Sequence, residues 1–370
     1  MSQIKEFLVR IGLIFVSTAF ALAVIEVVLH LWNPFGLRLK GDRIVLPVNL
    51  VYNITLPTNV PQSGLEPVVV HRKNSLGMRG PEPPADLANH LSIITIGGST
   101  TECFYLSEGK TWPDRLNALL APSFSGLWLD NAGLDGHSTF GHIVLMEDVI
   151  AKLRPKVVVF LVGVNDLARS DAMLPDLRNI NDGFRFSSPR EFIYWLTKKS
   201  EVAGLVLAIY RSWQARNMAV DHDFSNAAKK LREAAPTEAE VSTELDKNRE
   251  SISGYHKRLD RLVAIANKHA ILPVFVTQPS RARPMEGESS PMSWLVLERY
   301  NDETRAVAAQ HSVPLIDLAR ALPGDPTYYY DNYHFSLAGA EAVGRVMASN
   351  LCPLLAERFP QYRQELCSAS

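Results

Sequence analysis

The sequence predicts an α/β protein built on a five-stranded parallel sheet and preceded by one apolar helix that spans a membrane. From Leu91 onward, apolar strands alternate with helical stretches, which is the pattern of βαβ units. The strands are rich in Val, Ile and Leu and do not alternate with polar residues, as expected for strands buried on both faces. The N-terminal 31 residues contain one long apolar run. Together these three observations define the fold class.

The N-terminal segment decides the compartment. Residues 7–31 are almost continuously apolar, with Glu26 near the end. At about 1.5 Å per residue, a helix of this length crosses the roughly 30 Å hydrocarbon layer of a bilayer. Lys5 and Arg10 favour a cytoplasmic N-terminus. We therefore expect a single-pass membrane protein whose remaining residues lie on the periplasmic or extracellular side, with Glu26 near the interface.

A cleavable signal peptide is the alternative for this segment. The triplets Ala19-Phe20-Ala21 and Ala21-Leu22-Ala23 resemble the small-residue cleavage sites of signal peptides. The apolar run continues past both sites to Leu31, which is longer than a typical signal-peptide core. We therefore expect an uncleaved anchor, and either interpretation exports the rest of the chain.

Composition excludes several classes of function. The 370 residues carry 38 Lys and Arg against 39 Asp and Glu, and the basic residues are scattered, so no nucleic-acid partner is expected. Cys103, Cys352 and Cys367 lack metal-ligand spacing, and no His-Glu-x-x-His motif occurs, so no metal site is expected. A disulfide between Cys352 and Cys367 is conceivable, but we expect free or buried thiols.

The remaining elements follow in chain order. Residues 32–88 are rich in Pro and Asn and are expected to form a connector with short strands. Strands of the sheet are expected at Ser92–Gly97, Leu127–Asn131, Val157–Val162, Ile271–Thr277 and Val313–Asp317. Helices are expected near Trp112–Leu120, His142–Leu153, Pro291–Gln310 and Ser336–Leu351, with Ser336 as the N-cap of the last one.

A long insertion interrupts this alternation. Residues 167–270 are far more than a usual α/β connection, and we expect a helical insertion at about 170–250. Thr237 and Glu240 have capping-box spacing and lead into a long helix through Asn267. An amphipathic stretch around Phe192–Trp213 precedes it. The insertion is either a cap over the ligand crevice or a partner surface, and its apolar side chains are more often used for helix packing.

Ser99 is the candidate nucleophile. The strand at Ser92–Gly97 ends in glycines and is followed by a helix. This order places the Ser99 hydroxyl at the carboxyl edge of the sheet, where open α/β sheets bind ligands. The N–H groups of that helix would point at a developing oxyanion. The alternative is a Gly-Ser turn that only caps a helix.

Acyl transfer also needs a base, a group that orients the base, and donors for the oxyanion. His334 is the candidate base, and Asp331, three residues earlier, can reach its other ring nitrogen. Gly136 follows the second strand and Asn165 follows the third, so a backbone amide and a side-chain amide can point into the same crevice. Asp166 is expected to brace the loop of Asn165. Each of these is also an ordinary turn residue, but all of them lie just after the carboxyl ends of strands that can border one crevice.

With these residues the sequence resembles the SGNH (GDSL-like) hydrolase family. The matching blocks are Gly97-Gly98-Ser99, Asn131-Ala132-Gly133-Leu134-Asp135-Gly136, Gly163-Val164-Asn165-Asp166 and Asp331-Asn332-Tyr333-His334. Residues 73–82, ahead of the first strand, resemble the membrane-anchored bacterial branch. The resemblance implies a flavodoxin-like three-layer α/β/α fold over residues 89–355, and ester hydrolysis without metal or organic cofactor.

The resemblance also implies the role of each site residue. Ser99 is the nucleophile, and His334 with Asp331 completes the triad. The oxyanion hole is formed by the Ser99 N–H, the Gly136 N–H and the Asn165 side chain, which are the expected donors. The Asp that usually precedes the serine is Gly98 here, which removes a carboxylate that could brace the site.

An α/β-hydrolase is disfavoured, because its nucleophile elbow needs Gly-x-Ser-x-Gly and Thr101 occupies the last position. Arg79 is expected to have a structural role near the first strand.

Three functional classes remain. The leading one is a membrane-anchored serine esterase acting on an acylated small molecule, envelope carbohydrate or lipid. The second is an O-acyltransferase that uses the same triad to acylate an exported polysaccharide. The third is a non-catalytic membrane-anchored binding protein that uses the insertion to hold a partner. The protein partners are not indicated by any motif.

Overall fold

The computed structural model describes residues 2–32, 39–40, 43–44, 46, 48–56, 64–169, 196, 199–206, 209, 235–365 and 367. The chain forms two compact units. The first comprises Met1–Pro47 and Asp176–His222, and the second Val48–Pro175 and Asp223–Ser370. The amphipathic stretch expected around Phe192–Trp213 lies largely outside the described residues.

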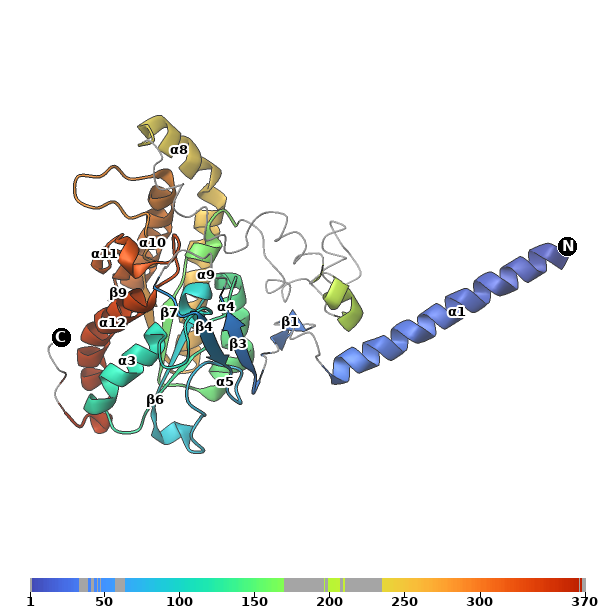
Figure 1. Ribbon diagram of the computed structural model, residues 1–370, viewed down its shortest axis with the longest axis horizontal. Helices are drawn as coiled ribbons and strands as arrows, with labels where there is room; N and C mark the ends of the chain where they lie inside the picture. The colour runs from blue at the N-terminus through green and yellow to red at the C-terminus, as the bar shows by residue number, and fades with distance from the viewer. Residues whose placement is uncertain are drawn as a thin grey trace. The chain divides into compact units, whose positions relative to one another are not determined.

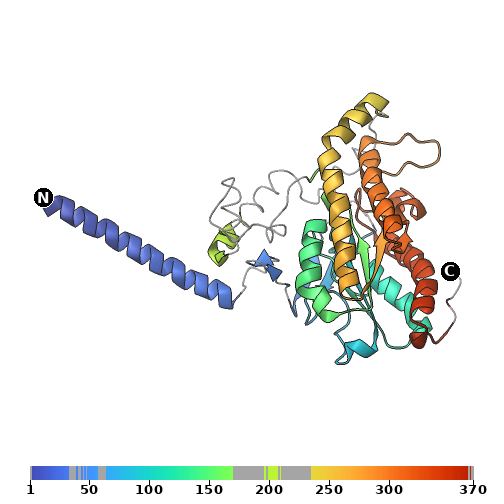
Figure 2. The same cartoon turned by 180° about the vertical axis from the view of Figure 1, so that it is seen from behind.

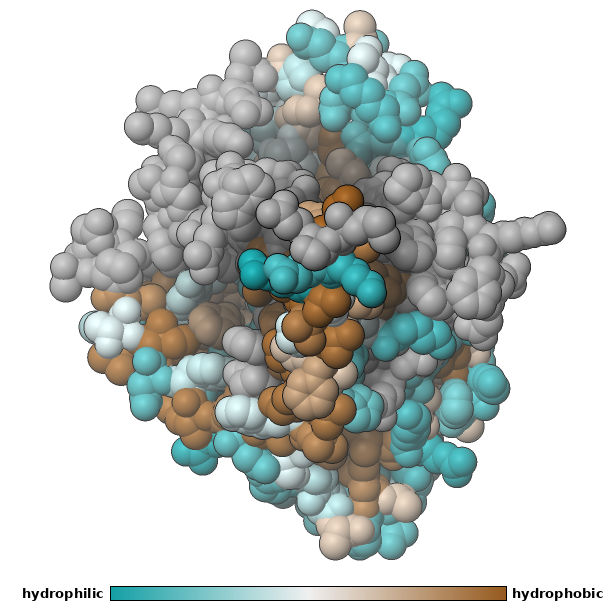
Figure 3. All heavy atoms as spheres, turned by 90° about the vertical axis from the view of Figure 1, so that its right-hand side faces the viewer, coloured by the Kyte–Doolittle hydropathy of each residue, from teal (hydrophilic) through white to brown (hydrophobic). Residues whose placement is uncertain are grey.

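The first unit contains α1 (Ser2–Leu31), a 30-residue helix. Its segment Ile4–Leu31 is long and apolar enough to cross a membrane. The side chains of this segment are almost all exposed, and Figure 3, which looks toward the N-terminal end of α1, shows hydrophobic side chains uncovered on its surface. The same unit holds the antiparallel pair β1 (Leu39–Lys40) and β2 (Arg43–Ile44) and the helical residues 201–206.

The second unit is built on the predicted parallel sheet, and all five expected strands are confirmed. They are β5 (Leu91–Gly97), β6 (Leu127–Asn131), β7 (Val157–Leu161), β8 (Leu272–Val276) and β9 (Leu315–Ile316). Their spatial order is β6-β5-β7-β8-β9, and every pairing is parallel. This is the flavodoxin-like order, which reverses direction at β5 and places a crevice at the carboxyl end of that strand.

Helices cover both faces of the sheet, as the three-layer fold requires. On one face α3 (Trp112–Leu120) and α12 (Leu337–Arg358) pack together (Figure 1). Buried side chains of both helices form one core with inward residues of all five strands. On the other face lie α4 (Thr139–Leu145), α9 (Arg249–Lys268) and α10 (Met292–Gln310), which Figure 2 shows from behind.

Shorter elements complete this unit. The hairpin of β3 (Val51–Thr55) and β4 (Val68–Arg72) precedes the sheet. The short helical segments are η1 (Leu87–Asn89), α2 (Ser99–Glu102), η2 (Ala121–Ser123), α5 (Ala151–Leu153), η4 (Val164–Asp166), α8 (Glu238–Lys247), α11 (Leu318–Ala321), η7 (Pro326–Tyr328) and η8 (Pro360–Tyr362).

Local sequence signals explain where several helices begin. The Ser336 hydroxyl accepts a hydrogen bond from the Gly339 amide at 3.1 Å and caps α12, as expected. Thr237 and Glu240 form the expected capping box. The long helix expected after it is instead two helices, α8 and α9, which meet at Asn248. The side chain of Asn248 bonds the backbone oxygen of Glu244 at 2.9 Å, so this residue closes α8.

The helix expected at His142–Leu153 begins earlier and is less regular. It starts at Thr139 as α4, passes through the π-helical turn η3 (Met146–Ile150) and ends as α5. The earlier start follows from Ser138, whose extended backbone occupies the N-cap position.

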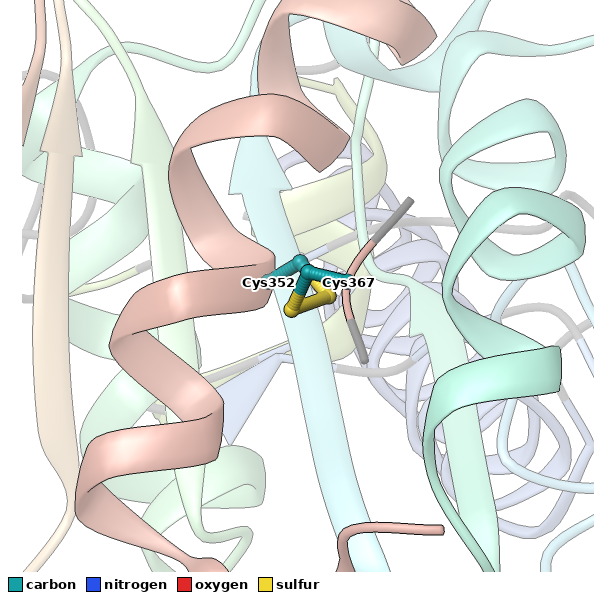
Figure 4. The surroundings of a disulfide bond; sticks show 2 residues. All are labelled: Cys352 and Cys367. Atoms are coloured by element: carbon teal, nitrogen blue, oxygen red, sulfur yellow. A yellow bond between two sulfur atoms is a disulfide. The ribbon is translucent and has the colours of Figure 1, made fainter. Parts of the chain in front are cut away.

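The expectation of free thiols at Cys352 and Cys367 is wrong. The two residues form a disulfide with a Cα–Cα distance of 5.8 Å (Figure 4). The reason lies in the chain after α12, because η8 turns the C-terminal segment back along the helix that carries Cys352. Cys103 is a free, buried thiol. Disulfides of this kind are typical of exported proteins.

Candidate active site

Ser99 lies at the carboxyl end of β5, where the strand gives way to α2. Its side chain is almost buried, with 7% of the residue exposed. Gly97 is required by close packing at this turn, because a Cβ there would overlap the Thr101 side chain and the Leu161 carbonyl of β7. The glycine thus lets the chain pass close to the neighbouring strand and lift Ser99 to the sheet edge.

A continuous chain of hydrogen bonds runs from Ser99 to Asp331. His334 Nε2 lies 2.7 Å from Ser99 Oγ, and His334 Nδ1 lies 2.6 Å from Asp331 Oδ2. Asp331 Oδ1 accepts from the backbone amides of Tyr333 at 2.8 Å and His334 at 2.7 Å. The carboxylate is therefore held by its own turn. With Nδ1–H donated to Asp331, Nε2 is left to accept the Ser99 proton.

Tyr330 supports the imidazole from its flat side. The two rings are stacked, with centroids 5.4 Å apart and planes only 9° from parallel. The Tyr330 amide also donates to the His334 carbonyl at 3.0 Å. Burial raises the pKa of the Tyr330 hydroxyl well above its usual value, so the ring remains neutral. Sequence reasoning missed Tyr330, although an aromatic residue directly before Asp331 was a usable signal.

The three donors expected for the oxyanion hole lie in the segments that follow the neighbouring strands β5, β6 and β7. Asn165 lies in η4, after β7, and its Nδ2 donates to the His137 carbonyl at 2.9 Å, which leaves one of its two amide hydrogens for a ligand. Gly136 lies in the adjacent loop with a φ of +71°. Within the described part of the chain, the amides of Ser99 and Gly136 donate to no protein acceptor. The structure thus links Ser99, His334 and Asp331 by hydrogen bonds and packs Asn165 against Gly98, while Gly136 precedes His137, whose carbonyl binds Asn165.

Gly98 is packed directly against one of these donors. A Cβ at Gly98 would overlap Asn165 Nδ2 and would come within 3.0 Å of the His137 carbonyl. Asn165 therefore occupies the space that the side chain of the usual Asp would need at position 98.

Glu102, which sequence reasoning also missed, fixes the loop that carries Gly136. Its Oε2 accepts from the Asp135 amide at 2.5 Å, directly before Gly136. Its Oε1 is paired with Lys73 Nζ at 2.9 Å, and both side chains are buried. Burial and the nearby Arg79 and Lys73 charges lower the pKa of His71 to about 3, so this neighbour of Glu102 is neutral. The Lys73 charge is thus balanced by Glu102, and the Arg79 charge by Glu108, which lies 2.6 Å from Arg79 Nη2.

Arg79 has the structural role that was expected for it. The side chain is buried, and Nη1 donates to the carbonyls of Glu102 and Cys103 while Nη2 donates to that of Leu106, each at 2.7 Å. Its backbone pairs with Asn131 beside β6. The segment that follows the Ser99 helix is thereby tied to residues 73–82.

Asp166 braces the loop of Asn165, as expected. Its carboxylate is fully buried and accepts from the Thr139 hydroxyl at 2.5 Å and from Arg258 Nη2 at 3.1 Å. The Arg258 guanidinium also lies 3.7 Å from the ring centre of Phe140. These contacts connect η4 with the start of α4 and with α9.

Replacing Arg258 with alanine is expected to destabilise the protein by about 3–5 kcal/mol, because it leaves the Asp166 carboxylate buried without a charge partner. The free energy of unfolding in urea measures this loss. The matched control is Arg261→Ala on the same helix, whose partner is Glu147 at 2.8 Å and whose side chain is 60% exposed. We expect a loss below about 1 kcal/mol there. Equal losses in the two variants would contradict this account of Asp166.

Within the described ranges, no group of three or more His, Cys, Asp or Glu side chains is arranged to hold a metal ion.

Comparison with known proteins gives one family match. The sequence profile of the GDSL-like lipase/acylhydrolase family matches residues 95–342. A search of curated proteins finds no match. The matched range begins in β5, before Ser99, and ends in α12, after His334, so it includes every residue of the site.

Several solved structures are similar at low identity. An alpha/beta hydrolase enzyme from the metagenome of Lake Arreo, Spain, has 20% identity and a TM-score of 0.42, covering 70% of this chain and 95% of that one. An acetylxylan esterase from Geobacillus stearothermophilus has 15% identity and a TM-score of 0.41, covering 70% and 93%. A lipase/acylhydrolase from Enterococcus faecalis has 16% identity and a TM-score of 0.39, covering 72% and 96%.

Proposed function

Because the chain belongs to the GDSL-like lipase/acylhydrolase family, we propose that it is a serine esterase with Ser99 as nucleophile, His334 as general base and Asp331 as the group that orients the base. The observation that carries the proposal is the hydrogen-bond chain from Ser99 Oγ through His334 to Asp331. A nucleophile, a base and an orienting carboxylate in this geometry are the requirements of acyl transfer through a covalent intermediate.

The reaction follows from these contacts in two steps. His334 Nε2 takes the proton as Ser99 Oγ attacks the ester carbonyl carbon. The negative charge that develops on the carbonyl oxygen is stabilised by the Ser99 N–H, the Gly136 N–H and the Asn165 side chain. His334 then protonates the departing alcohol, and the acyl group stays on Ser99. Water activated by the same imidazole attacks this acyl-serine and releases the acid.

The surroundings of His334 suit both of its protonation states. When the imidazole becomes positively charged, Asp331 stabilises it across the 2.6 Å contact with Nδ1. The two backbone amides that bind Asp331 Oδ1 prevent this carboxylate from turning away. Tyr330, stacked on the ring, restricts rotation of the imidazole out of line with Ser99.

The N-terminal helix is proposed to anchor the enzyme in a membrane, with the catalytic unit on the periplasmic or extracellular side. Lys5 and Arg10 at the start of α1 favour a cytoplasmic N-terminus. The disulfide between Cys352 and Cys367 fits an oxidising compartment. An acyl ester on an envelope carbohydrate or lipid is the substrate class that this location offers.

Two measurements test the proposed function. A fluorophosphonate probe should label the purified protein at Ser99, since the probe reports an activated serine. No label at Ser99 would favour the non-catalytic binding protein. Incubation with an aryl acetate and an envelope polysaccharide then separates the enzyme classes. Free acetate with unchanged polysaccharide supports the esterase, whereas transfer of acetyl to the polysaccharide identifies an O-acyltransferase.

A further inference from the structure

Glu26 is a carboxylate within the apolar part of α1, five residues before the end of this helix. Its side chain is bound by the distant residues 200–202, which belong to the same compact unit. Glu26 Oε2 accepts from the Ser200 hydroxyl at 2.9 Å and from the Val202 amide at 3.1 Å, and Oε1 accepts from the Glu201 amide at 2.5 Å. Three donors from one short segment therefore converge on this carboxylate.

A second contact lies one helical turn further along α1. His30 Nδ1 is 3.2 Å from Glu201 Oε1. Residues four apart on a helix share one face, so Glu26 and His30 present the same stripe of α1 to residues 200–202. The insertion is thus held against one side of the C-terminal end of α1.

These bonds fix the depth of the insertion if α1 spans a membrane. Five residues at about 1.5 Å each put Glu26 about 7.5 Å from the end of the helix. A carboxylate at that depth is costly unless donors reach it. Residues 200–202 supply the donors, so their backbone must lie at the same level of the bilayer as Glu26.

The side chains of the residues after Ser200 are also suited to a position at the level of the membrane interface. Residues 201–206 are helical and include Val202, Leu205 and Val206. Val206 is 61% exposed and Ile209 is 60% exposed, and Leu196 on the other side of the contact is 38% exposed. Lys199, also exposed, adds a positive charge to this segment, which favours binding to anionic lipid. Apolar side chains uncovered next to a membrane-level contact indicate lipid as their neighbour.

We propose that residues 199–206 and Ile209 lie in the interfacial layer of the membrane beside α1, with Val206 and Ile209 among the lipid acyl chains. Glu26 is the residue that ties the segment to the anchor. The inference rests on the proposed membrane anchor and is independent of the catalytic roles. It gives the insertion a lipid partner instead of a purely packing role.

The test measures the depth of single cysteines in the full-length protein, reconstituted into vesicles of phosphatidylcholine and phosphatidylglycerol. Val206→Cys and Ile209→Cys are labelled with a nitroxide, and collisions with oxygen and with a nickel chelate are compared. Phe15→Cys in the middle of α1 is the lipid reference, and Lys247→Cys on α8, 66% exposed, is the water reference. The native cysteines do not compete for the label, because Cys103 is buried and the other two are bonded.

We expect oxygen collisions to dominate at 206 and 209, as at 15, and nickel collisions to dominate at 247. Adding Glu26→Ala should shift position 206 toward the values of the water reference. If collisions with the nickel chelate dominate at 206 and 209, the proposed lipid contact is wrong, although the proposed membrane anchor still holds. The same conclusion follows if both positions are protected from both reagents. Water-like values at 15 would instead contradict the anchor itself. An unchanged ratio at 206 in the Glu26→Ala protein would overturn the role given to Glu26.

Discussion

Replacing Ser99 with alanine is expected to lower kcat on a short aryl ester by roughly 10⁴–10⁶-fold, which is the range for loss of a triad nucleophile. The substitution removes the oxygen that forms the acyl-enzyme bond and leaves His334 without a proton to accept. The remaining donors can still polarise a bound carbonyl, so a small residual rate is compatible with the mechanism. Steady-state release of the aryl alcohol measures the effect.

The same variant should fold normally. Among the residues that the structure describes, the Ser99 hydroxyl bonds only the His334 ring, and Ser99 lies at the first position of α2. The thermal unfolding midpoint should therefore match that of the unmodified protein. Ser125→Ala is a matched control, because it removes a hydroxyl that bonds the Tyr362 carbonyl at 3.1 Å, remote in the fold from the carboxyl edge of β5. Full turnover in Ser99→Ala would remove the triad from the mechanism.

Much of the fold is encoded locally and was predictable. The strands of the sheet are short, apolar and buried on both faces, and such runs differ from the amphipathic helices between them. Helix starts at Ser336 and Thr237 were predictable because a cap depends on residues within one turn. The break at Asn248 was missed because the sequence around it keeps a helical pattern, whereas α8 and α9 run in different directions in the structure (Figure 2).

The residues of the site also divide into those that the sequence predicted and those that it did not. The five predicted residues stand directly after strands or in one short turn, so their positions follow from the order of the elements. Glu102 and Lys73 could not be paired in advance, because their 2.9 Å contact depends on how the segment before the sheet folds back over α2. The bond between Cys352 and Cys367 likewise depends on the reversal of the chain at η8. Contacts of this kind are set by tertiary structure and leave no pattern in the sequence.

Replacing Asn165 with alanine is expected to lower kcat by about 10²–10³-fold, the usual effect of losing one oxyanion donor. Replacing Gly98 with alanine should produce a loss of similar size for a different reason. The new Cβ would overlap Asn165 Nδ2, so the amide must leave its place beside the His137 carbonyl. The φ of Gly98 is −84°, a negative value that alanine also adopts, so the expected loss is attributed to the overlap with Asn165.

A double-variant cycle distinguishes this steric coupling from a separate effect of Gly98. Once Asn165 is alanine, the severe overlap is gone, and the close neighbour that remains is the His137 carbonyl at 3.0 Å, which has to move by only a few tenths of an ångström. The Gly98→Ala/Asn165→Ala protein should therefore be no slower than Asn165→Ala alone, since residues in contact are not additive. Steady-state kcat for the four proteins, with their thermal unfolding midpoints as a check on folding, gives the coupling. Losses that multiply would mean that Gly98 acts independently of Asn165, and the interpretation of Gly98 as the residue that makes room for the oxyanion donor would be wrong.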